Sequence, residues 1–191
     1  MKPFTKSELI SVVIIFTVLA AISIPNFILS LTKSRDQSRK DDLGTMVSAL
    51  DNYYTDFGEF PKSSPDGKIV ACKKPEDQVK VDIKGHVIVN LIPCEWGKDS
   101  IVDFTPGSTK VYIAQIPRDP DYLTRGSSYL YFSNGIRYQL YASLESHDWD
   151  EYDPKIEARH LLCGTKICNI GRSFSQTPTD ISIEEYEIKL K

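Results

Sequence analysis

The sequence predicts an α+β fold in which one long N-terminal α-helix, transmembrane in its first half, packs on a small antiparallel β-sheet head. Three observations carry this prediction. Residues 9–31 are apolar and carry no charge, residues 43–57 repeat apolar side chains at spacings of three and four, and two alternating runs flank Asn134-Gly135. The length of 191 residues suits one globular domain plus an additional element.

The first element is a membrane-spanning helix over residues 9–31. At ~1.5 Å per residue this run covers roughly 35 Å as a helix, enough to cross a bilayer core of about 30 Å. It is longer than the apolar core of a secretory signal peptide and no A-x-A-like cleavage site follows it, so we expect a retained single-pass anchor. The basic residues after the span favour a cytoplasmic head, whereas the cysteines favour an extracytoplasmic one, and we give the cysteines more weight.

The same helix continues beyond the membrane as an amphipathic segment. Gly58 suits the position after a helix end and Pro61 cannot continue a helix, so we expect one helix over residues 4–58 and a head over residues 59–191. The side chains expected on the apolar face are Leu43, Met46, Val47, Leu50, Tyr54 and Phe57. Those expected at polar positions are Lys33, Arg35, Asp36, Asp42, Asp51 and Asp56.

The sequence predicts a head that is built mainly of short β-strands. Runs at 79–83, 86–92 and 111–116 favour strands, and 181–190 favours a last one. The clearest signal is Asn134-Gly135 between 129–133 and 136–142, which predicts a hairpin because both turn residues tolerate positive φ. In that hairpin we expect one face toward the helix, formed by Tyr129, Tyr131, Ile136, Tyr138 and Leu140.

Four cysteines, Cys72, Cys94, Cys163 and Cys168, suit two disulfides in an oxidising compartment. Three pairings are open, and reduced thiols or a zinc site are the alternatives, although no C-x2-C pair occurs. We predict Cys72–Cys94 and Cys163–Cys168, because each bond closes a local loop.

Residues 146–153 form an acidic turn after the hairpin. Its carboxylates are the oxygen ligands that calcium prefers, although the glycine and terminal glutamate of an EF-hand are absent. The candidate calcium ligands are Asp148, Asp150, Glu151 and Asp153. The alternative is a solvated acidic turn without metal.

Composition and motifs exclude several classes of function. Hydrophobic residues make up 41% and charged residues 26%, as in folded globular proteins. The formal net charge of -3 leaves no basic surplus, so nucleic-acid binding is not indicated. None of the nucleophile-elbow, P-loop, zincin or dinucleotide-binding motifs occurs, and His86, His147 and His160 are scattered. We expect no enzymatic activity.

The N-terminal third resembles type IV pilins and type II secretion pseudopilins, and the likeness extends more loosely to about residue 143. The Tyr-Tyr-x-Asp-x-Gly-x-Phe-Pro ending of the helix is most similar to the major pseudopilins. The segments that carry the resemblance are Phe4-Thr5, Glu8-Leu9, 20–27, 50–61, 116–120, 129–131 and 138–141. Two departures are Pro3, where the family has glycine, and Lys6-Ser7, where it has apolar residues.

The resemblance implies roles for three residues. A prepilin peptidase would remove a leader of residues 1–3 and methylate the new amino group of Phe4. Glu8, the fifth mature residue, would pair with the free amine of a neighbouring subunit; the alternative is a solvated glutamate at the headgroups. Pro25 would bend or locally melt the helix near residues 21–26 for packing in a filament, or form an ordinary kink.

The resemblance also implies a function. The chain would be a structural subunit of a type IV pilus-like filament, held in the membrane before assembly and extracytoplasmic or on the cell surface afterwards. Its partners would be identical subunits, the prepilin peptidase and an inner-membrane assembly platform. The alternatives are a pseudopilin of a type II secretion system and a single-pass anchored binding domain that never polymerises.

Overall fold

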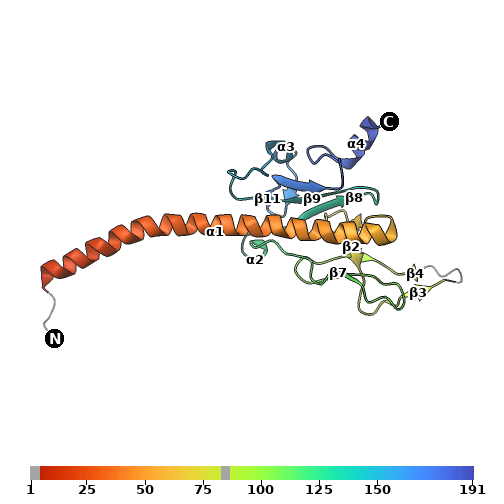
Figure 1. Cartoon of the computed structure of the whole chain (residues 1–191), viewed down its shortest axis with the longest axis horizontal. Helices are drawn as coiled ribbons and strands as arrows, with labels where there is room; N and C mark the ends of the chain where they lie inside the picture. Colours follow the sequence, from red (N-terminus) through yellow and green to blue (C-terminus); the bar gives the residue numbers. More distant parts are fainter. Residues whose placement is uncertain (1–4, 83–86) are drawn as a thin grey trace.

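The structure, a computed structural model, describes residues 5–82 and 87–191. Its main element is the helix α1 (Lys6–Phe57), whose 52 residues correspond to about 78 Å of helix. The second half of α1 lies inside the head and the first half projects from it (Figure 1). The predicted α+β fold, a long apolar N-terminal helix packed on small antiparallel sheets, is confirmed.

Helix α1 ends where the sequence predicts. Gly58 adopts the left-handed conformation with φ 72°, and its N–H donates to the carbonyl of Tyr54 at 2.7 Å. Glycine reaches this conformation without the steric cost that a Cβ would bring. The chain therefore leaves the helix at this point and enters the head.

Helix α1 is continuous through Pro25. The helix is continuous from Lys6 to Phe57, and its apolar half curves gently away from the axis of the second half (Figure 1). The side chain of Asn26 donates to the carbonyl of Ile22 at 3.0 Å, one turn back. The predicted local melting over residues 21–26 is therefore wrong, and a bend at Pro25 stays a prediction.

The larger sheet of the head has the order β12-β9-β8, from β8 (Leu130–Ser133), β9 (Tyr138–Ala142) and β12 (Ile170–Ser173). In the antiparallel β8–β9 hairpin Tyr131 lies opposite Leu140, and Ser133 lies opposite Tyr138. These pairs place Tyr131, Tyr138 and Leu140 on one face, which belongs to the main core together with residues of α1. The predicted hairpin and the inward tyrosines are confirmed.

The expectation for Ile136 in that hairpin is wrong. Ile136 belongs to the connection between the strands, where its side chain is 65% exposed. The side chain of Asn134 accepts hydrogen bonds from the backbone N–H groups of Ile136 and Arg137. This Asx-type turn uses more residues than a two-residue Asn-Gly loop, so Ile136 is removed from the strand.

The remaining strands are short and antiparallel. One sheet has the order β1 (Lys62–Ser63), β2 (Ile69–Cys72) and β5 (Ile92–Pro93). Three further pairs are β3 (Lys80–Val81) with β4 (Val87–Ile88), β6 (Ile101–Val102) with β7 (Val111–Ile113), and β10 (Leu162–Cys163) with β11 (Lys166–Ile167). The predicted runs 79–83, 86–92 and 111–116 therefore contain strands, apart from residues 83–86, including His86, which lie outside the described residues.

In the described part of the head three short helices accompany the strands: α2 (Tyr122–Arg125), α3 (Pro154–Glu157) and α4 (Ile183–Lys189). The last of these corrects the predicted strand over 181–190. Ser182 caps α4 by accepting from the N–H of Glu185 at 3.1 Å, and Lys189 pairs with Glu185 one turn away at 2.8 Å. A side-chain cap and an i,i+4 ion pair both favour helix over strand.

The core surrounds the second half of α1. The sheet β12-β9-β8 lies along one side of the helix, and β2 and β7 lie along the other (Figure 1). Leu43, Met46 and Leu50 of α1 are at most 1% exposed. Their partners in the main core include Ile69, Ile101, Ile113, Ile116, Tyr131, Tyr138 and Leu140.

Candidate functional site

The apolar half of α1 is an exposed surface. Every side chain from residue 5 to residue 31 is exposed, including Phe16 at 68% and Phe27 at 64%. Burial of large apolar side chains is normally the main stabilising contribution to a fold, so a surface of this kind requires lipid or other helices around it. Among the described residues one helix, α1, is long and apolar enough to cross a membrane.

Two hydroxyl groups in this half hydrogen-bond to their own helix. The hydroxyl of Ser11 donates to the carbonyl of Ser7 at 3.0 Å, and that of Thr17 donates to the carbonyl of Val13 at 2.8 Å. Such i−4 bonds hide hydroxyl groups that would be costly in lipid. The surface over residues 9–31 therefore presents no unpaired hydroxyl at these two positions.

Glu8 closes the N-terminus of α1. Its Oε2 accepts from the backbone N–H of Thr5 at 2.8 Å, while Thr5 Oγ1 accepts from the N–H of Glu8 at 3.4 Å. This reciprocal arrangement is a capping box, which satisfies two helix donors that have no partner in the helix. The carboxylate lies at the lip of the apolar surface, where a neighbouring chain can reach it. Phe4, the predicted processing site, lies outside the described residues.

A buried ionic cluster joins α1 to the head just beyond the apolar half. We call it the ionic junction and define it by Asp36 and Arg39 of α1 with Asp119, Asp121 and Glu145 of the head. Arg39 is 1% exposed and Asp36 is 0% exposed. An unpaired charge buried this deeply would strongly destabilise the fold, so both side chains need partners of opposite charge or hydrogen-bond donors.

Arg39 uses its whole guanidinium in the junction. Nε and Nη2 donate to the two oxygens of Asp119 at 2.8 and 3.2 Å. Nη1 donates to Asp36 at 2.7 Å and to Glu145 at 3.0 Å, and Nη2 also donates to Asp121 at 3.0 Å. Burial alone lowers the pKa of Arg39, but the hydrogen bonds to Asp119 and its partners raise it above the ordinary value, so the side chain stays charged.

Asp36 of α1 accepts hydrogen bonds from the segment after β9. Its carboxylate accepts from the backbone N–H groups of Glu145 and Ser146, both at 2.9 Å, and from Trp149 Nε1 at 3.2 Å. These donors come from one short stretch of chain, so the position of Asp36 fixes where that stretch lies against the helix.

Glu145 receives two further arginines at the edge of the junction. Arg35 binds it through two nitrogens at 2.6 and 2.7 Å, and Arg125 Nη1 approaches at 3.0 Å. The hydrogen bonds from Arg35, followed by those from Arg39, hold the pKa of Glu145 well below its usual range. The carboxylate is therefore ionised at neutral pH and attracts three arginines.

Sequence reasoning placed Asp36 at a polar position of α1 and did not detect the junction. A signal for it was present: positions 36, 39, 43, 46 and 50 follow one another at spacings of three and four. Asp36 and Arg39 thus lie on the stripe that Leu43, Met46 and Leu50 bury. Because both residues are charged, the sequence analysis did not extend the buried face of α1 toward its apolar half.

The structure contains two disulfides, Cys72–Cys94 and Cys163–Cys168, the pairing expected from local loop closure. The first joins β2 to the segment after β5, and the second closes the β10–β11 hairpin. No free cysteine occurs among the residues that the structure describes.

The four acidic residues of the 146–153 turn do not converge. Glu151 approaches Lys40 at 3.5 Å and Arg172 at 3.9 Å, and Asp153 caps α3 by accepting from the N–H of Lys155 at 2.8 Å. Asp148 and Asp150 are exposed. Across residues 5–82 and 87–191 no group of three or more potential ligands lies in a metal-binding arrangement. Calcium binding stays a prediction. If the head gives identical melting curves with calcium and with a chelator, the segment is a solvated acidic turn without metal.

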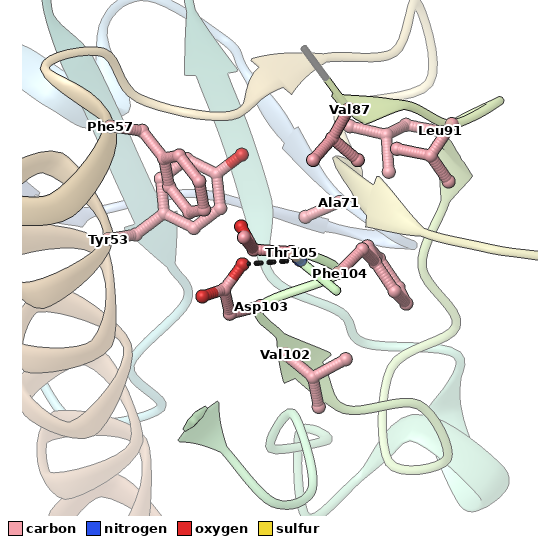
Figure 2. A pocket seen from close by; sticks show the side chains of 10 residues that line it. Tyr53, Phe57, Ala71, Val87, Leu91, Val102, Asp103, Phe104 and Thr105 are labelled. Carbon is pink, nitrogen blue, oxygen red and sulfur yellow. Dashed lines mark hydrogen bonds between the residues drawn. The ribbon is translucent and has the colours of Figure 1, made fainter. Parts of the chain in front are cut away.

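An apolar pocket of about 350 Å³ lies at the end of α1 that is remote from the apolar half (Figure 2). Tyr53 and Phe57 form one wall, and Phe104 and Val102 belong to the opposite side. The charged residue among those that line the pocket is Asp103, whose carboxylate accepts from the N–H of Thr105 at 2.8 Å. The mainly apolar lining of this pocket suits an apolar group.

Known proteins give no independent guide to these surfaces. The chain matches no family model, no curated protein and no solved structure.

Proposed function

We propose that this chain is the structural subunit of an extracellular type IV pilus-like filament. The apolar half of α1 would hold the subunit in a membrane before assembly and would pack against identical subunits afterwards. A prepilin peptidase would process the chain before Phe4, and an inner-membrane platform would receive it.

One observation supports this proposal above the others. A single helix is fully exposed and apolar over residues 9–31 and is then fixed in the head by the core and the ionic junction. A rigid connection of this kind would pass an axial force from one subunit's head to the helices of its neighbours. A flexible linker after residue 31 would be sufficient for a simple anchor.

A second candidate within the same class is a pseudopilin of a type II secretion system. The Tyr53–Pro61 ending of the helix is the feature that favours it, through its resemblance to major pseudopilins. Both candidates use the same assembly surface, so filament length separates them: long surface filaments would favour the pilin, and short envelope-spanning ones the pseudopilin.

A third candidate is a membrane-anchored domain that does not polymerise. The capping box favours it, because Glu8 already has a hydrogen-bond partner in its own chain. The decisive experiment is electron microscopy of sheared cell-surface material, with mass spectrometry of the N-terminus of the chain found there. The proposal expects filaments whose subunits begin with N-methylated Phe4. A monomer that retains Met1 in the membrane fraction would contradict it.

A further inference from the structure

A second pocket lies at the membrane-facing end of the head, beside the ionic junction. We call it the juxtamembrane pocket; it has a volume of about 300 Å³, and Arg125, Ser127, Ser143 and Lys166 line it together with Asp121 and Glu145. Its walls come from α2 and the residue Ser127 after it, from the segment that follows β9, and from β11, and α2 and β11 lie at the end of the head nearest the apolar half of α1 (Figure 1).

The pocket contains a buried hydroxyl group without a partner. Ser127 is 1% exposed, yet its Oγ makes no hydrogen bond to any described residue. A buried polar atom normally has a partner, because leaving it unpaired costs free energy. Ser127 therefore indicates that a polar group enters this pocket.

The free donors of the pocket are cationic. Arg39 also lines the pocket, but its guanidinium nitrogens already donate hydrogen bonds to the carboxylates of the ionic junction. Lys166 is exposed and forms no ion pair with the described residues, and within the described chain the Arg125 guanidinium donates its hydrogen bond, to Glu145, through Nη1. The carboxylates of Asp121 and Glu145 are already paired with arginines. The donors left for a ligand thus suit an anion.

The depth of the pocket matches the headgroup layer. Arg35, which shares Glu145 with Arg125, follows the end of the apolar run by about 6 Å along α1, and Arg39 follows it by about 12 Å. The headgroup layer extends roughly 5–8 Å beyond the hydrocarbon core on each side. Exposed apolar side chains flank the pocket on the same elements: Leu123 at 75%, Leu162 at 62% and Ile167 at 39%.

We propose that the juxtamembrane pocket binds the phosphodiester of an anionic phospholipid in the membrane that anchors α1. Lys166 and the free N–H groups of Arg125 bind the phosphate oxygens, and the hydroxyl of Ser127 donates to one of them. The inference rests on the proposed membrane-anchored state of the subunit. It adds a specific lipid contact that holds the head against the bilayer before assembly.

The test uses the full chain in nanodiscs of phosphatidylcholine, with or without phosphatidylglycerol. Hydrogen exchange is read at the amides of Ser128 and Thr165, which donate to Cys163 and Gly126 and connect α2 to the β10–β11 hairpin. We expect about tenfold slower exchange with phosphatidylglycerol, the factor for a local lipid concentration near ten times Kd. Equal exchange in the two lipids would overturn the proposal.

Two variants and a control sharpen the result. Lys166→Glu should abolish the lipid effect, whereas Lys80→Glu, the same change on β3 at the far end of the head, should retain it. Ser127→Ala removes no hydrogen bond within the described chain, so it should leave exchange in phosphatidylcholine unchanged and reduce the phosphatidylglycerol effect. An undiminished effect in both pocket variants would refute the site.

Two further comparisons distinguish a lipid phosphate from a free phosphate ion and test whether α1 anchors the chain in a membrane. Inorganic phosphate added to phosphatidylcholine nanodiscs should give little protection; full protection would identify a free-anion site and overturn the lipid assignment. If the chain enters both kinds of nanodisc but its hydrogen exchange is the same in each, the lipid site is rejected and the proposed membrane anchor is retained. Failure to enter either nanodisc would reject the membrane anchor, and the lipid contact with it.

Discussion

Arg39 in the middle of α1 and Asp119 before α2 form a fully buried pair of hydrogen bonds across 80 residues of sequence. The planar guanidinium and the carboxylate meet through two atoms each, a geometry that fixes direction as well as distance. Because α1 would otherwise be free to slide or rotate against an apolar core, this pair specifies which turn of the helix faces the head. It also places the base of the head a defined distance beyond the apolar half.

Replacing Arg39 by methionine should destabilise the head strongly. The change leaves Asp36, Asp119 and Asp121 buried without their common cation, and breaking a buried pair from one side costs about 3–5 kcal/mol. Urea unfolding of the full chain in detergent measures the difference. The control is Lys33→Met, an exposed position on the same helix, which should stay within about 0.5 kcal/mol of wild type. Equal stabilities of the two variants would show that the junction contributes little.

Acid should weaken the junction through Glu145. Its pKa is lowered in the folded state, chiefly by Arg35, so its stabilising contribution is present above the unfolded value of about 4.3 and is lost as pH falls through the folded value. Asp42 has the opposite effect on the pH dependence of stability, because its pKa is raised in the folded state. Burial raises this pKa, although Tyr129 donates a hydrogen bond to the carboxylate.

The corresponding measurement compares wild type with Glu145→Gln across pH. Above about pH 5 the wild type should be more stable by a constant amount, and below about pH 4 the difference in unfolding free energy should shrink. A difference that is independent of pH down to the lowest value at which the head stays folded would contradict the assigned role of Glu145.

The two disulfides should contribute unequally. The Cys72–Cys94 bond spans 22 residues and the Cys163–Cys168 bond spans 5. In the chain-entropy account these loops correspond to about 3 and about 2 kcal/mol. Replacing each pair by serines and measuring thermal unfolding tests the order. A peptide map that joins Cys72 to Cys163 or Cys168 would overturn the pairing.

The elements that the sequence predicts well are those with local signals. The end of α1 depends on Gly58, the hairpin depends on Asn134-Gly135, and each disulfide closes a short loop. In each case the residues that decide the structure are close together in the chain. The apolar run over residues 9–31 is equally local, because an uncharged run can be recognised without any knowledge of the fold.

The junction could not be predicted in the same way. Sequence alone gives Arg39 as a surface charge, because its partners are distant in the chain: Asp119 and Asp121 lie in one segment, and Glu145 lies in another. The 181–190 segment fails for another reason: its apolar residues fit a strand, but the Ser182 cap and the Glu185–Lys189 pair favour a helix. Local capping thus outweighs β-propensity there.

The role of Glu8 can be separated into capping and charge. Gln at the same position keeps a side-chain oxygen for the capping box but has no charge to pair with a neighbour's amine. Ala removes both. Thr5→Ala weakens the box and keeps the charge, since Thr5 Oγ1 is the acceptor for the Glu8 N–H.

If Glu8 pairs with a neighbouring subunit, Glu8→Gln and Glu8→Ala should both reduce filament formation, while Thr5→Ala should assemble nearly as well as wild type. The head should melt at the same temperature in all three variants, because Glu8 is remote from the core and fully exposed. Filaments are counted by electron microscopy in sheared fractions normalised to the amount of chain in the membrane. Normal assembly of Glu8→Gln with failure of Glu8→Ala and Thr5→Ala would assign Glu8 to the cap alone. Normal assembly of Glu8→Ala would remove Glu8 from the assembly mechanism.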